Sequence, residues 1–271
     1  MMKQCFLFVA LFLLGSPAIA QVIVDTTFNR VIRIEGEVYS SNKGMDMNLE
    51  SVGGFSPGTP LRFGSPDSRI IFISPEKELL MAIPNEDMSG YTTVPIRSKY
   101  NTRPGKILSY IAFVKFLEGR DWLVLGDSVQ LEVGKEEFPL SEDHVFFIRY
   151  QLQGDSLPVN KRLSHQGQQV LFSKQGIFQV DDQPAPIDST YGHQLFYYDA
   201  LKPASTLIHS IRLIFPDERR LRAEVAGIIR YLGIAYPKEE KIRAIQNYLF
   251  EVYGTPEKEN LQEWLKRHFN L

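Results

Sequence analysis

Apolar residues in the first third of the chain fall in short runs of strand length. The runs at residues 22–24, 31–34, 70–73 and 79–83 are β-branched or otherwise apolar, as is typical of strands. Turn residues such as Gly53-Gly54 and Pro57-Gly58 separate them. This pattern predicts a small β-rich domain, a barrel or a sandwich, over residues 21–84.

The middle of the chain combines a polar stretch, one helical pattern and more strand-like runs. Residues 85–103 are polar and contain Pro95, which predicts a linker or an exposed loop. From Pro104 the apolar spacing is helical, with Gly119 as a C-terminal cap. Strand-like runs then follow at residues 122–125, 129–133, 145–150, 170–172, 177–180, 194–198 and 207–214. We therefore expect a helix followed by a second β-rich region within residues 104–215.

The last part of the chain changes to helical spacing. Helix starts are indicated at Pro216, at Pro237 and at Thr255-Pro256, and each is followed by a single apolar stripe. We expect three helices within residues 216–271 that pack together or cover the preceding sheet. The expected fold class is mainly β with α: two small β-rich regions joined by a helix, plus a C-terminal unit of three short helices.

Residues 1–20 have the three parts of a secretory signal peptide. Lys3 is followed by an apolar run of about ten residues, too short for a spanning helix, and then by an Ala-x-Ala pattern that ends at Ala20. We expect cleavage there, export to the periplasm or the cell exterior, and no membrane span in the mature chain. Cys5 is the only cysteine, so the expected mature chain has neither thiolate chemistry nor disulfides.

Composition narrows the partner classes. The chain is 44% hydrophobic and 23% charged with a formal net charge of −2, which is typical of a folded protein. The balanced charge argues against nucleic acid as the main partner, because phosphate binding normally requires a basic excess.

Sequence motifs for catalysis and cofactors are weak. Gly154-Asp155-Ser156-Leu157 resembles the nucleophile signature of the GDSL esterase family, but no Asp-x-x-His occurs in the chain. A near copy at Gly126-Asp127-Ser128-Val129 also follows a strand-like run, which favours hairpin turns at both places. Histidines and acidic residues lack metal-ligand spacing, and no phosphate-binding glycine motif occurs. We therefore expect no metal, no cofactor and no assignable catalytic residue.

The strongest candidate binding residues form a basic group in and after the expected loop. The group consists of Arg97, Lys99, Tyr100, Arg103 and Lys106, and it lies in a stretch without acidic residues. Such a group is suited to an anionic glycan, a lipid headgroup or an acidic face of another envelope protein. A second candidate contact surface is the outside of the terminal helices near Tyr248, Tyr253 and Trp264.

Two resemblances extend this interpretation. The order of strand and turn residues in the first third of the chain resembles small periplasmic β-barrel segments of the iron-dicitrate-regulator type. The residues that carry this resemblance are Ile34-Glu35-Gly36-Glu37-Val38, Gly58-Thr59-Pro60-Leu61 and residues 70–73. The whole chain, particularly residues 123–129 and 259–266, is similar to uncharacterised exported proteins of Bacteroidota. The first resemblance implies a small periplasmic β domain and the second an exported protein, and neither transfers a functional residue.

The sequence as a whole predicts an exported, noncatalytic binding or assembly module of the cell envelope. Its contact would use the basic group or the terminal helices. An alternative is a metal-independent hydrolase of envelope glycan or peptide that uses paired carboxylates in one deep pocket. A structural subunit of a larger surface complex is a third possibility, which the sequence does not separate from the first.

Overall fold

The computed structural model describes residues 27–42, 45–51, 53–97, 102–119, 121–180, 183–202 and 204–271. The expected signal peptide and the expected strand at residues 22–24 lie outside this part of the chain. The strands are β1 (Asn29–Glu35), β2 (Val38–Asn42), β3 (Met45–Asn48), β4 (Gly54–Phe55), β5 (Leu61–Phe63), β6 (Arg69–Ile73), β7 (Leu79–Pro84), β8 (Tyr91–Pro95), β9 (Lys106–Ile107), β10 (Trp122–Leu123), β11 (Ser128–Val133), β12 (His144–Leu152), β13 (Val159–Arg162), β14 (Ser164–Gln166), β15 (Gln169–Ser173), β16 (Gln179–Val180), β17 (Gln183–Pro184), β18 (Thr190–Asp199), β19 (Thr206–Ser210), β20 (Leu213–Ile214) and β21 (Thr255–Pro256). The helices are α1 (Tyr110–Leu117), α2 (Lys174–Phe178), α3 (Glu218–Leu232), α4 (Lys238–Val252) and α5 (Lys258–Phe269), with short 3-10 turns at Leu49–Ser51 and Ile187–Ser189.

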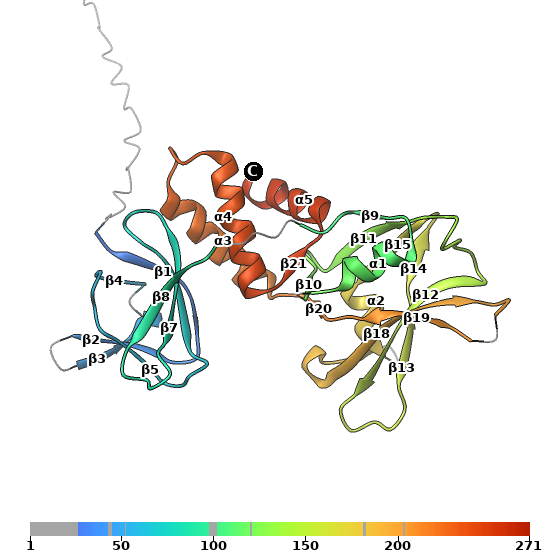
Figure 1. The fold of residues 1–271 in the computed structure, drawn as a ribbon, viewed down its shortest axis with the longest axis horizontal. Helices are drawn as coiled ribbons and strands as arrows, with labels where there is room; N and C mark the ends of the chain where they lie inside the picture. Colours follow the sequence, from blue (N-terminus) through green and yellow to red (C-terminus); the bar gives the residue numbers. More distant parts are fainter. Residues whose placement is uncertain are drawn as a thin grey trace, which may run out of the picture.

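The N-terminal β-rich unit consists of two antiparallel sheets. The described strands of the larger sheet follow the order β4-β1-β6-β7-β8, and those of the smaller one the order β3-β2-β5. Their shared core includes Ile34, Val38, Phe63, Ile70 and Phe72. In Figure 1 this unit is the blue and teal part at the left.

The second β-rich unit is a sandwich whose two sheets have the orders β14-β15-β11-β9 and β13-β12-β18-β19 among the described strands. Alternate residues of the long strands point into one core, which includes Leu131, Phe172, Phe146, Ile148 and Leu195. Helix α1 packs against this core. One buried and one solvated face per sheet is the usual result of such alternation.

The three C-terminal helices lie between the two β-rich units, where Figure 1 shows them in orange and red. One apolar core joins α3, α4 and α5 to Ile71 and Ile73 of β6 and to Leu123 and Leu125. β6 is therefore buried on both faces, since its other apolar side chains, Ile70 and Phe72, belong to the N-terminal core. The helices cover a sheet, as expected, but it is the sheet of the N-terminal unit.

A small parallel sheet connects the helical unit to the sandwich. β10 pairs with β20 on one side and with β21 on the other. The chain reaches β21 through Gly254 at φ +117°, and a Cβ atom at this position would lie 2.3 Å from the carbonyl oxygen of Asp121. Only glycine combines this backbone angle with so close an approach.

The expected fold class is confirmed: the described chain is mainly β, with two β-rich units, the α1 connection and three C-terminal helices. None of the helices in the described part of the chain has the length and apolar composition that crossing a bilayer requires.

Three local expectations were wrong. The helix expected from Pro104 begins only at Tyr110, after the cap Ser109, because residues 106–107 pair with β11 as the strand β9. Residues 91–95, expected within a linker or an exposed loop, form the strand β8, which pairs with β7. Its polar side chains suit an edge position, where one face and one edge meet water. Residues 177–180, expected as a strand, are divided between α2 and β16, because the hydroxyl of Ser173 caps a helical turn by accepting the N–H of Gly176 at 3.1 Å.

A partly buried polar network joins β1 to the helical unit. Nη1 of Arg33 donates to Oε1 of Glu224 at 2.9 Å and to the hydroxyl of Tyr253 at 2.6 Å. The same hydroxyl donates to Oε2 of Glu224 at 2.6 Å. Nε of Arg33 donates to Glu35 at 2.6 Å, and Arg69 binds the other oxygen of Glu35. Each charge is thereby matched by an opposite one.

Burial disfavours the charged forms of Arg33 and Glu35, whereas their hydrogen-bonded and charged neighbours favour them. Burial alone lowers the pKa of the Arg33 guanidinium, but Tyr253 and Glu224 outweigh it and raise that pKa above its ordinary value. Burial likewise raises the pKa of Glu35, and the hydrogen bonds from Arg69 and Arg33 lower it below its usual range. Arg33 and Glu35 therefore stay charged around neutral pH.

Replacing Arg33 by methionine should destabilise the protein by about 2–3 kcal/mol, because the buried carboxylate of Glu224 then keeps only the half-exposed Arg220 and the Tyr253 hydroxyl as partners. The measurement is the free energy of unfolding in urea. The matched control is Arg222→Met, which removes an exposed arginine of α3 and should change the free energy by less than about 0.5 kcal/mol. Equal effects of the two variants would contradict this account.

Candidate functional site

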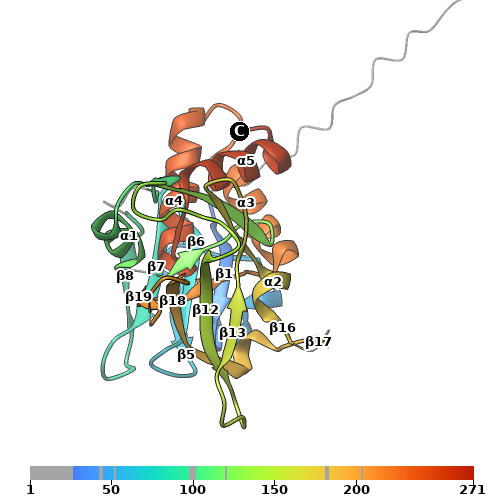
Figure 2. The same cartoon turned by 90° about the vertical axis from the view of Figure 1, so that its right-hand side faces the viewer.

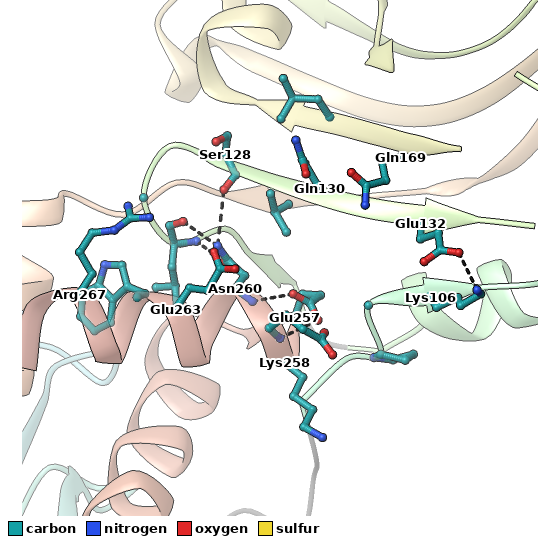
Figure 3. Close-up of a pocket in the computed structure, with 18 residues that line it drawn as sticks. Lys106, Ser128, Gln130, Glu132, Gln169, Glu257, Lys258, Asn260, Glu263 and Arg267 are labelled. Atoms are coloured by element: carbon teal, nitrogen blue, oxygen red, sulfur yellow. Dashed lines mark hydrogen bonds and ion pairs between the residues drawn. The ribbon is translucent and has the colours of Figure 1, made fainter. Parts of the chain in front are cut away.

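An open groove of about 800 Å³ lies between the start of α5 and the outer face of the sheet that contains β11. Figure 3 shows its two walls. One wall consists of side chains from β9, β11 and β15, and the other consists of Glu257 and side chains from α5. The lining includes Gly105, Lys106, Gln130, Glu132, Gln169, Glu257, Glu259, Asn260 and Glu263.

The α5 wall is positioned by the buried side chain of Glu257, which is 1% exposed. Its two carboxylate oxygens accept the N–H of Glu259 at 2.8 Å and the N–H of Asn260 at 2.6 Å. These are backbone donors that the first turn of a helix leaves without a partner inside the helix. Glu257 therefore caps α5, and its carboxylate is held at the base of the groove.

Asn260 connects α5 to the turn that precedes β11. Its Oδ1 accepts the N–H of Leu125 at 2.9 Å, and its Nδ2 donates to the carbonyl of Leu125 at 2.9 Å and to that of Ser128 at 3.5 Å. A side-chain amide that satisfies both groups of one residue behaves like a backbone partner. The distance between the helix and the first residues of β11 is consequently set by Asn260.

The strand wall offers polar side chains to solvent. Gln130 of β11 and Gln169 of β15 are both exposed, and neither amide bonds to another group within the described residues. Glu132 forms an ion pair with Lys106 at 2.5 Å across the parallel β9–β11 pair. The wall thus combines two available amides with a solvent-exposed ion pair.

Two carboxyl groups in the groove have pKa values that are displaced in opposite directions. Burial, together with the hydrogen bond to Glu259, raises the pKa of Glu257 to about 7. That hydrogen bond lowers the pKa of the exposed Glu259. A Cβ atom at Gly105 would lie 2.4 Å from a carboxylate oxygen of Glu259 and 3.0 Å from one of Glu257. The glycine lets the backbone run close beside this pair.

The predicted basic group is not a single surface. The Arg97 side chain is 74% exposed and pairs with Glu78 at 3.2 Å. Lys106 lines the groove. Lys99 and Tyr100 lie outside the described residues. Whether any of these residues binds a partner stays a prediction.

Arg103 was expected in an exposed loop. This expectation was wrong, because the residue is only 7% exposed. Its N–H donates to the carbonyl of Pro256 at 3.0 Å, its carbonyl accepts the N–H of Lys258 at 2.9 Å, and its guanidinium stacks over Phe116. Burial lowers the pKa of Arg103 to about 10, against the opposing charge of Asp121. Arg103 therefore fixes the chain beside β21, and charge alone could not reveal this, because its backbone partners Pro256 and Lys258 are over 150 residues away.

The second expected contact surface was the outside of the terminal helices, but two of its three aromatic side chains are buried in the core. Tyr248 and Trp264 are 0% and 2% exposed and belong to the core that joins the helices to β6. The two Gly-Asp-Ser strings are turns, as expected: Gly126 and Asp127 both have positive φ before β11, and Gly154 has φ +95° between β12 and β13. Neither string provides a placed nucleophile.

The structure brings together one serine–histidine–aspartate set that the spacing did not reveal. The Ser141 hydroxyl lies 3.0 Å from Nδ1 of His144, and Nε2 of His144 lies 3.2 Å from Oδ1 of Asp199. The same hydroxyl accepts the N–H of Asp143, and Asp199 also pairs with Lys202. These contacts secure the turn before β12 against the end of β18, which accounts for the set as a structural one.

Comparisons with known proteins give no family. No protein-family model matches the sequence, and no curated protein is detectably similar to it. Among solved structures the chain is similar to the chicken CNTN1 FN1-FN3 domains, with 8% identity over 70% of this chain and 67% of that chain and a TM-score of 0.19. At that score the likeness carries no argument about the site. Within the described residues, no group of three or more metal-ligating side chains is placed to hold an ion.

The raised pKa of Glu257 predicts that the protein loses stability as the pH rises from about 4.5 to about 7. In that interval the folded state binds more protons than the unfolded state, so the free energy of unfolding falls with pH. We expect a loss of about 1–2 kcal/mol, since the open groove admits solvent that weakens the effect.

The measurement is urea unfolding at pH 5 and at pH 8. The Glu257→Gln variant should lack this part of the decline, whereas Glu263→Gln, at an exposed position in the same groove, should keep it. The lowered pKa of Glu259 acts in the opposite sense, and its contribution is lost only as the pH falls below about 4.5. Identical pH dependence in the wild type and in Glu257→Gln would refute the assignment.

Proposed function

We propose that this protein is an exported, noncatalytic binding or assembly module of the cell envelope and that its partner docks in the groove between α5 and β11. The observation that carries this proposal is the groove itself, which has about 800 Å³ of open space between two fixed walls. The amino-terminal pattern of residues 1–20 supports export. Concave sites with a few convergent polar groups are the usual form of binding sites.

The fixed position of both walls supports recognition rather than movement. Asn260 ties α5 to the turn before β11, and the pairing of β9 with β11 places Lys106 opposite Glu132. The exposed amides of Gln130 and Gln169 are free to donate to and accept from a ligand. A site that needs no rearrangement loses little conformational entropy on binding.

A single cysteine in the groove tests this proposal, because the only natural cysteine is Cys5, in the expected signal peptide. We expect Gln130→Cys carrying a benzophenone crosslinker to attach covalently to one defined envelope component in intact cells of the source organism. Mass spectrometry of the crosslinked peptide identifies that component. Gln262→Cys, an exposed position of α5 outside the groove lining, is the matched control and should not capture it.

Addition of the unlabelled mature chain should reduce the yield from Gln130→Cys, since both compete for one partner. Equal capture from both positions, or no capture from Gln130→Cys with complete labelling, would contradict docking in the groove.

A second candidate function is a metal-independent hydrolase of envelope glycan or peptide. Glu257 and Glu259 favour it, because they line one groove and their pKa values are displaced in opposite directions, as a general acid and its companion carboxylate require. The position of Glu257 at the helix cap gives its carboxylate a structural task as well.

If this second candidate is correct, purified mature protein will release sugars or peptides from isolated envelope material. Glu259→Gln should then lower the rate at least 100-fold while leaving the midpoint of thermal unfolding within a few degrees, since Glu259 is exposed. Glu263→Gln is the control that keeps activity. No release by the wild type between pH 4 and pH 8 removes this candidate and leaves the binding proposal unaffected.

A further inference from the structure

The outer face of the β13-β12-β18-β19 sheet presents an aromatic row beside a row of hydrogen-bond donors. Figure 2 shows these strands running across the second β-rich unit. Their inward residues, such as Phe146 and Tyr197, fill the sandwich core. The alternate residues point outward, and the register of the strands places them in rows that cross the sheet.

The aromatic row is centred on Phe147 of β12 and Phe196 of β18. The two are direct cross-strand partners, and their rings stack in parallel with centroids 5.1 Å apart and an interplanar angle of 6°. The row continues with Leu207 of β19, which is 42% exposed. Tyr198, on the same face of β18, is 40% exposed. The face therefore shows apolar and aromatic surface to water.

The neighbouring row contains Asn160, Arg149 and Gln194, which are paired across β13, β12 and β18. Oδ1 of Asn160 accepts from Nε of Arg149 at 2.8 Å, and the guanidinium lies over the Phe196 ring at 4.8 Å. Arg149 is thus held by a hydrogen bond and by a cation–π contact. Its two terminal nitrogens, and the amide of Gln194, bond to no other group in the described part of the chain.

The charge of this face favours an anionic partner. Neither row contains a carboxylate. The aromatic row also contains Arg162, the cross-strand partner of Phe147, whose terminal nitrogen pairs with the exposed Glu142 at 3.4 Å. Asp199 pairs with His144 and Lys202. A guanidinium fixed through Nε keeps the paired terminal nitrogens that bind a carboxylate with two parallel hydrogen bonds.

The geometry also favours a sugar over a peptide. Extended peptides bind sheets mainly through backbone groups at an edge, whereas the backbone groups of the central strands β12 and β18 are paired on both sides. Such a face can offer only side chains. Pyranose rings suit this surface because their apolar C–H faces pack on aromatic surface while their hydroxyl and carboxylate groups reach amide and guanidinium donors.

We propose that this face binds an acidic polysaccharide, with Arg149 holding a uronic acid carboxylate and with Phe147, Phe196 and Tyr198 packing against the sugar rings. This site is separate from the groove and does not depend on the function proposed for it. Phe147, Phe196 and Tyr198 would supply apolar contact, and Gln194 and Asn160 would donate to sugar oxygens.

Affinity electrophoresis and calorimetry with the mature chain test the proposal, with polygalacturonate, alginate and hyaluronate as probes. We expect retention by at least one of them and a loss of at least tenfold in affinity for Arg149→Met. Arg149→Lys should recover only part of the affinity, because lysine lacks the paired donors. Arg243→Met, an exposed arginine on α4, is the control of equal charge change and should bind like the wild type.

Two further measurements separate the alternatives. The polysaccharide that is retained should lose its binding when its carboxyl groups are methyl-esterified, and poly-glutamate should not compete with it. Gln194→Ala, a smaller change at a half-buried position, should weaken binding severalfold with unchanged thermal unfolding. This result would show that the effect of Arg149→Met is not a folding defect.

The proposal is overturned if none of the three uronic-acid-containing polysaccharides binds, if Arg149→Met binds as well as Arg243→Met, or if the methyl ester is retained equally. Competition by poly-glutamate at equal charge concentration would also overturn it, since that result assigns the face to acidic peptides.

Discussion

The arrangement of the molecule depends on one short segment that is buried on both faces. Residues 122–125 are each no more than 2% exposed. The side chains of Trp122 and Val124 point into the sandwich core, and those of Leu123 and Leu125 point into the core of the helical unit. β10 also pairs with β20 on one edge and with β21 on the other. The segment therefore contacts both the sandwich and the helical unit.

The candidate groove follows from this shared segment. The chain continues from Leu125 through the Gly126-Asp127 turn into β11, while β21 leads directly to the Glu257 cap of α5. Both walls therefore start from strands of the same small sheet. Asn260 then adds hydrogen bonds between the two walls. Truncation of Asn260 would therefore change the distance between the two walls of the groove, although every lining residue of β9, β11 and β15 is kept.

The two candidate surfaces differ in their physical character. The groove is concave and polar, and it contains carboxylates beside Lys106. The outer sheet face is aromatic, carries the available guanidinium of Arg149 and has no carboxylate in its two central rows. The groove also contains Lys258 and Arg267, so its charges are nearly balanced and a neutral hydrogen-bonding partner suits it. An anionic partner suits the second surface. The sandwich places them on opposite sheets.

Local signals in the sequence determined the types of most elements. Short apolar runs marked the strands of both β-rich units, prolines and single apolar stripes marked the three terminal helices, and glycine marked the turns before β11 and β13. These signals act over a few residues, which is the range within which backbone angles and caps are decided. They failed where a neighbour decided the outcome: β8 required an edge of β7, which no polar pattern at residues 91–95 discloses.

Tertiary structure alone decided the sites. Glu257 has a raised pKa because the fold buries it at the start of α5 and places Glu259 within hydrogen-bond distance. Arg103 looked like a surface charge until Phe116 and β21 covered it. Arg149 gained its fixed orientation from Phe196 and Asn160 on neighbouring strands. The physical reason is the same in each case: periodicity records which side of an element is apolar, while burial, charge pairing and register depend on partners that are distant in the chain.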